Sequence, residues 1–72
     1  MTPEEAKLMT QNYFEKHNLL FEGAYPVNKG KERELHIHVF GPKGRFMMRM
    51  QKDATLYTQN STRKKWIKIE KY

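Results

Sequence analysis

A two-residue alternation of apolar and polar side chains runs through the second half of the chain, and it limits the fold more than any other feature. In residues 33–40 every second side chain is aliphatic, at Leu35, Ile37 and Val39. Residues 45–51 and 65–72 repeat the pattern. A period of two indicates strands that have one buried face. We therefore expect several antiparallel strands in this half.

The first residues have the pattern of a helix start. Thr2 can cap the helix, Pro3 suits the first helical position, and Glu5 follows the cap by three residues, as a capping box requires. At about 100° per residue, one broad helix face collects Ala6, Met9, Thr10, Tyr13, Phe14 and His17. We expect this face to pack on the sheet and Asn18 to end the helix.

Turn residues divide the rest of the chain into strands. Tight connections are expected at residues 28–31, 41–44, 52–53 and 60–63. Pro26 cannot donate a ladder hydrogen bond, so a strand in residues 20–27 should be an edge strand or irregular. The predicted fold is α+β: one N-terminal helix packed on a four- to five-stranded antiparallel meander sheet. Residues 1–72 should form a single compact domain.

The alternation assigns side chains to two faces of this sheet. The face under the helix should hold Leu35, Ile37, Val39, Phe46, Met48, Met50, Leu56, Ile67 and Ile69. The opposite face should hold His36, His38, Phe40, Arg45, Met47, Arg49, Tyr57, Trp66 and Lys68. A one-residue bulge would move every later side chain of a strand to the other face.

Positive charge is concentrated in the strand half of the chain. The net charge is +6, and residues 28–72 hold twelve Lys or Arg against four Asp or Glu. Such a field attracts polyanions, although basic surfaces also keep small proteins soluble. Sheet faces with exposed rings and cations can stack unpaired bases and neutralise phosphates.

The leading hypothesis is therefore a small binding protein that docks single-stranded or structured nucleic acid on a basic and aromatic sheet face. The residues expected to bind are His36, His38, Phe40, Arg45, Arg49, Tyr57, Arg63, Lys64, Lys65, Trp66 and Lys68. The alternative is a small protein-binding regulator, inhibitor or adaptor that acts through an exposed strand edge or an apolar and basic patch. An edge strand would also allow a homodimer.

The chain offers little to an enzyme or a metal site. It has no cysteine, and the segment from Gly41 to Gly44 lacks phosphate-loop spacing. His36 and His38 have the spacing of two zinc ligands, but a third ligand is missing because His17 belongs to the helix. Glu32 and Glu34 stand among cations, which favours ordinary carboxylates over a catalytic acid. No catalytic residue, metal or cofactor is predicted.

No apolar stretch approaches the length of a membrane span, and the N-terminus lacks the layout of a signal peptide. We therefore expect a soluble, cytoplasmic protein without a membrane partner.

Overall fold

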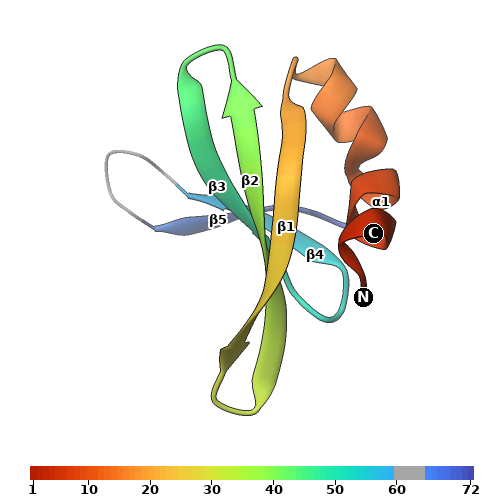
Figure 1. The fold of residues 1–72 in the computed structure, drawn as a ribbon, viewed down its shortest axis with the longest axis vertical. Helices are drawn as coiled ribbons and strands as arrows, with labels where there is room; N and C mark the ends of the chain where they lie inside the picture. Colours follow the sequence, from red (N-terminus) through yellow and green to blue (C-terminus); the bar gives the residue numbers. More distant parts are fainter. Residues whose placement is uncertain (60–64) are drawn as a thin grey trace.

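One helix precedes five strands in the computed structural model, which describes residues 1–59 and 65–72, without the side chain of Lys29. The elements are α1 (Pro3–Lys16), β1 (Leu20–Lys29), β2 (Glu32–Gly41), β3 (Gly44–Met50), β4 (Thr55–Gln59) and β5 (Trp66–Lys71). The strands pair antiparallel in the order β1-β2-β3-β4-β5 (Figure 1). The expected α+β fold, a helix followed by a meander, is confirmed.

The helix begins and ends where the sequence predicts. The Glu5 N–H donates to the Thr2 hydroxyl at 3.2 Å, and the Glu5 carboxylate accepts from the Thr2 N–H at 3.3 Å. These two bonds form the capping box and satisfy two otherwise free donors. Asn18 follows the helix with a φ of 55°, a left-handed conformation that stops further turns.

The buried stripe of α1 is narrower than predicted. Ala6, Thr10 and Phe14, spaced four residues apart, are buried, and the Thr10 hydroxyl donates to the Ala6 carbonyl at 2.8 Å. Met9 and His17 were expected to face the sheet, but both are exposed. The helix lies along β1 at one side of the sheet, so only one row of its side chains meets the core (Figure 1).

The connections between strands use the conformations that tight turns need. Gly44 closes the β2–β3 turn with a φ of 114°. Between β3 and β4 the Thr55 N–H donates to the Asp53 carboxylate at 3.1 Å, and Ala54 adopts a φ of 66°. The hydrogen bonds from Thr55 are the main cause that lowers the pKa of Asp53. The predicted turn at residues 60–63 lies outside the described residues.

The core lies between α1 and the sheet face that points toward it. Six of the predicted inward side chains are buried there: Leu35, Ile37, Val39, Met48, Met50 and Leu56. Ile69 is partly buried and packs against this cluster. The alternation in the sequence therefore identifies the centre of the core correctly.

Phe46 and Ile67 correct the predicted core at its margins. Both face the same side as the core residues, because Phe46 pairs with Val39 and Ile67 with Thr58. Nevertheless Phe46 is 38% exposed and Ile67 is 45% exposed. Phe46 lies on β3 and Ile67 near the start of β5, whereas α1 lies along β1 (Figure 1). The helix therefore does not cover these two side chains.

Both edges of the sheet reach the same helix. At one edge β1 packs on α1. At the other, burial and the nearby Glu70 carboxylate raise the pKa of Tyr13 on α1. Tyr72 follows β5, and burial, then hydrogen bonding and charge interaction with Glu70, raise its pKa as well. The sheet therefore curls around α1, and the face turned away from the helix, here called the outer face, is convex (Figure 1).

Candidate nucleic-acid interface

The strand register brings most of the predicted binding residues onto the outer face. On β2 and β3 the pairs are His36 with Arg49, His38 with Met47, and Phe40 with Arg45. Tyr57 pairs with Arg49 on one side and Lys68 on the other, and Trp66 pairs with Gln59. The β4–β5 register shifts between Leu56 and Tyr57, which pair with Glu70 and Lys68. Trp66 and Lys68 precede this bulge on β5, so both stay on the outer face.

Three predicted residues lie outside these pairs. Lys65 is exposed and directly precedes β5. Arg63 and Lys64 were also predicted to bind, but they lie outside the described residues.

Arg49 lies at the centre of the outer face and contacts two aromatic rings. Its Cζ is 4.8 Å from the centroid of the Trp66 ring and 4.9 Å from that of Tyr57. Both distances fit cation–π contacts, in which the ring face attracts the guanidinium charge. The Arg49 side chain is only 15% exposed. Strands β3, β4 and β5 therefore contribute one packed group of two rings and a cation.

A buried carboxylate holds this cation from the β2 side. Glu34 Oε2 lies 3.1 Å from Arg49 Nε, and Glu34 Oε1 lies 3.9 Å from His36 Nε2. The Glu34 side chain is only 6% exposed. Arg49 Nε and His36 Nε2 are buried without a hydrogen bond to any described residue, so the Arg49–Glu34 contact is an ion pair rather than an aligned hydrogen bond. The charge of Arg49 is thus largely compensated within the protein.

Sequence reasoning treated Glu34 as an ordinary carboxylate and identified neither its burial nor its ion-pair partner. Glu34 stands two residues before His36 on the same strand face, and His36 pairs with Arg49. Diagonal neighbours across an antiparallel pair are close enough for long side chains to meet. The alternation in β2 contained this signal, but only the register between β2 and β3 identifies Arg49 as the partner.

A second group of rings lies where β1 meets β2. The Tyr25 ring centroid is 5.1 Å from that of His38 and 5.9 Å from that of His36. His36 is half-buried, whereas Tyr25 and His38 are exposed. Tyr25 was not predicted, because Pro26 and the bulge after Phe21 hide the alternation of β1. The outer face therefore extends across all five strands.

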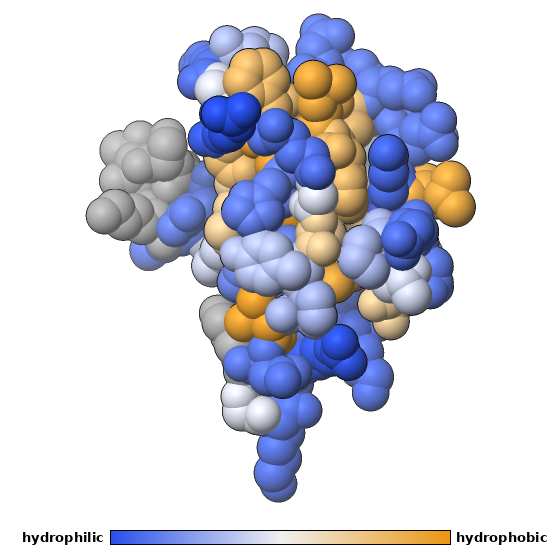
Figure 2. Space-filling model, in the orientation of Figure 1, coloured by the Kyte–Doolittle hydropathy of each residue, from blue (hydrophilic) through white to orange (hydrophobic). Residues whose placement is uncertain are grey.

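The outer face is apolar where β1 begins and β2 ends, at the top of the view in Figures 1 and 2. Leu20 pairs with Phe40, and their exposed fractions are 63% and 42%. Arg45 lies beside them: its Cζ is 5.6 Å from the Phe40 ring centroid, and its Nε is 3.1 Å from Glu22 Oε1. Figure 2 shows hydrophobic atoms gathered at the upper end of the molecule, next to strongly hydrophilic ones. We call Leu20 and Phe40 the apolar patch.

The described lysines and arginines that were predicted to bind fall into two classes. Arg45 and Arg49 each lie within ion-pair distance of a carboxylate. Lys65 and Lys68 are exposed, and neither forms an ion pair with another described residue. The two lysines near β5 are therefore better placed to meet an external anion than the two arginines.

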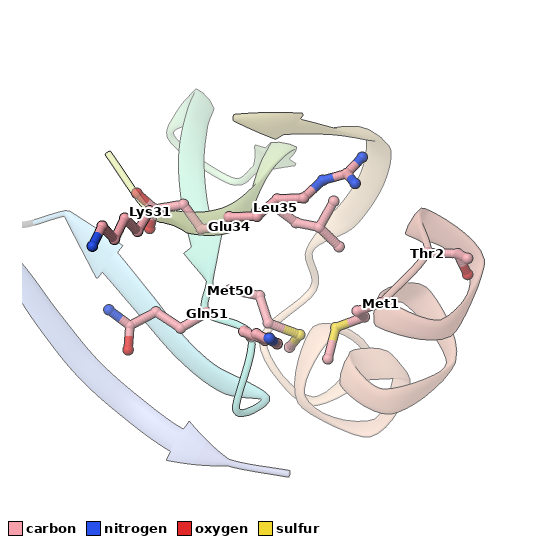
Figure 3. Close-up of a pocket in the computed structure, with 9 residues that line it drawn as sticks. Met1, Thr2, Lys31, Glu34, Leu35, Met50 and Gln51 are labelled. Carbon is pink, nitrogen blue, oxygen red and sulfur yellow. The ribbon is translucent and has the colours of Figure 1, made fainter. Parts of the chain in front are cut away.

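One open pocket lies away from these residues. It has a volume of about 440 Å³ and opens beneath the start of α1, between the first part of β2 and the end of β3. Figure 3 shows Met1 and Met50 pointing toward one another there, with Lys31 and Gln51 farther along the rim. None of the predicted binding residues lines it. The candidate interface is thus an open face rather than a cleft.

The two strand histidines do share a face, as their spacing predicts, but they contact rings and a carboxylate. No group of three His, Cys, Asp or Glu side chains that could hold a metal occurs among residues 1–59 and 65–72. The His17 ring lies 4.4 Å from that of Tyr13, on the helix.

Comparison with known proteins adds no family or fold relative. A scan against family models, a search of curated proteins and a search of solved structures each returned no match to this chain. Within the described residues, the single helix is too short and too polar to cross a membrane.

Proposed function

We propose that the protein binds nucleic acid, single-stranded or structured, on the outer face of its sheet. The observation that carries this proposal is the grouping of Arg49, Tyr57 and Trp66 with the exposed Lys68 on one uncovered face. Rings on a sheet face can stack bases, and nearby cations can neutralise phosphates. The excess of basic residues in the strand half of the chain supports the same ligand class.

The charges around the arginine and the lysines suggest different roles for them in binding. Because Glu34 compensates Arg49, that arginine would act mainly by holding the Tyr57 and Trp66 rings in place. Lys65 and Lys68 would supply most of the phosphate contacts. The rings would then contribute about 1–3 kcal/mol for each base that stacks on them.

A salt titration tests this proposal. For single strands, the logarithm of affinity falls with the logarithm of salt concentration by about 0.7 per phosphate contact. Lys68→Ala should therefore reduce the magnitude of the slope by about 0.7. Lys7→Ala, a matched change at an exposed lysine on the helix, should leave the slope unchanged. Failure of the parent protein to bind any oligonucleotide at low salt would eliminate the proposal.

A second candidate function is a protein-binding regulator or inhibitor. The observation that favours it is the apolar patch, where Leu20 and Phe40 lie side by side in the outer face. Exposed apolar groups beside charged ones are typical of protein contact sites. Gel filtration after nuclease treatment, followed by comparison with Leu20→Lys, would test it. A stoichiometric protein partner that is lost with this variant is the expected result, whereas unchanged binding argues against the patch.

The strand edges are less suitable for such a partner than the patch. The β1 edge contains a bulge between Phe21 and Gly23 and also Pro26, and the β5 edge carries Lys68 and Lys71. Bulges, proline and lysine are the usual devices that discourage pairing along an exposed edge. A homodimer through an edge strand stays a prediction. A cytoplasmic location, consistent with the lack of cysteine, is likewise a proposal.

A further inference from the structure

We infer that the nucleic acid bound by the outer face is an unpaired strand and not a duplex; this inference rests on the proposed function. The shape of the face supports an unpaired strand. Because β1 and the end of β5 both reach α1, the sheet curves around the helix and its outer face is convex. A duplex is also convex, so the two surfaces would touch over a small area only. An unpaired strand can bend to follow the face.

The width of the face leads to the same conclusion. The outer-face rings extend from Tyr25 on β1 to Trp66 on β5, four strand spacings apart. At about 4.8 Å for each spacing, this distance is about 19 Å. The major groove of B-DNA is about 12 Å wide and admits a helix or a two-stranded ribbon. A five-stranded face is too wide to enter it.

The charges of the face form an independent argument. Non-specific binding to a duplex depends on neutralising its phosphates with lysine and arginine. Here Arg45 pairs with Glu22, and Arg49 pairs with the buried Glu34. Both arginines on this face therefore already have a carboxylate partner. This face therefore suits a ligand whose binding free energy comes mainly from base stacking better than one whose binding free energy comes mainly from phosphate contacts.

The rings also need bases that a duplex does not expose. Tyr25 and Phe40 are exposed, and Tyr57 and Trp66 are half-buried on the uncovered side of the sheet. In a duplex the faces of the bases are stacked on one another, whereas in a single strand they are free to stack on protein rings. The outer face thus offers what unpaired bases require.

Three oligonucleotides of about ten nucleotides, a length within the usual site sizes, test the inference. They are a mixed-sequence single strand, the same strand annealed to its complement, and a single strand without bases. Trp66 is the only tryptophan, so its fluorescence reports binding directly. We expect the normal single strand to bind at least about 10-fold more tightly than the other two.

Two variants locate the effect. Trp66→Leu should weaken single-strand binding by about 10-fold, measured by the anisotropy of a labelled strand. Leu8→Ala, on the exposed side of the helix, should have no effect, and circular dichroism of both variants checks that they fold. Equal or tighter binding of the duplex, equal binding of the strand without bases, or an unchanged affinity of Trp66→Leu would overturn the inference. Absence of binding to all three oligonucleotides would instead refute the proposed function.

Discussion

At the scale of single residues, Glu34 shows how a local side chain shapes the whole outer face. Its carboxylate is buried 3.1 Å from Arg49, and Arg49 in turn contacts the Trp66 and Tyr57 rings. A buried pair of charges is costly to break, because the remaining partner keeps its charge without compensation. Glu34 is therefore expected to fix the geometry of three other side chains that it holds directly or through Arg49.

Replacing Glu34 tests this role. Glu34→Gln should lower the free energy of unfolding by about 2 kcal/mol and the melting temperature by roughly 10 °C, because Arg49 loses its counter-charge. The emission of Trp66 should shift at the same time. Glu32→Gln, at an exposed residue of the same strand, should change the free energy of unfolding by no more than about 0.5 kcal/mol. Its melting temperature should stay correspondingly close to that of the parent protein. Equal melting temperatures for the two variants would show that the ion pair does not stabilise the fold.

The backbone conformation of Ala54 leads to a prediction about stability. Its φ of 66° is a left-handed value that side chains with a Cβ adopt at a cost. Ala54→Gly should therefore raise the free energy of unfolding by up to about 1 kcal/mol, measured by urea titration. Ala24→Gly makes the same chemical change inside β1 and should destabilise the protein. A loss of stability in both variants would contradict this account of the β3–β4 turn.

At the scale of helices and strands, the sequence predicts the parts that depend on short-range patterns. The capping residues Thr2 and Glu5 mark the start of α1, Asn18 marks its end, and the alternation identifies β2 and β3. These features depend on neighbouring residues only, so they can be predicted without the tertiary structure. The same alternation correctly places Arg49, Tyr57 and Trp66 on one face.

The features that sequence reasoning missed depend on how distant segments meet. The position of Tyr25 on the outer face was not predicted, because a bulge interrupts the alternation of β1. Phe46 and Ile67 were assigned to the core because the pattern shows which way a strand side chain points, but not how far the helix extends over it. The role of Glu34 depends on the register of β2 against β3. Length, curvature and register are properties of the assembled sheet.

The contact between α1 and the end of β5 predicts a response to alkaline pH. Burial, followed by the charge of Glu70, raises the pKa of Tyr13, and burial with Glu70 also raises that of Tyr72. In the unfolded chain these phenols ionise near pH 10, whereas in the folded protein they stay neutral to higher pH. Their contribution to stability is therefore complete below about pH 10 and is lost as the pH rises further.

Urea unfolding at about pH 9 and at about pH 11 measures this effect. The parent protein should lose stability between the two values. A variant carrying Tyr13→Phe and Tyr72→Phe should lose less, because the two coupled phenols are absent. The same loss in parent and variant would mean that other groups cause the pH dependence.

At the scale of the whole molecule, the two faces of the sheet have different compositions and different surroundings. The concave face and α1 form the core, and the convex face displays rings and cations. Alternate side chains of β3 illustrate the division: Met48 and Met50 are buried in the core, whereas Met47 lies half-buried on the outer face. A ligand on the outer face would contact Met47 but neither Met48 nor Met50.

The methyl signals of these methionines give the most direct test that the outer face is the binding surface. They are recorded by nuclear magnetic resonance while a single-stranded oligonucleotide is added. We expect the Met47 methyl and the Trp66 indole signals to shift, and the methyls of Met48, Met50 and the helix residue Met9 to stay in place. Shifts confined to Met9, or no shift at Met47 and Trp66 when binding is saturated, would contradict this expectation.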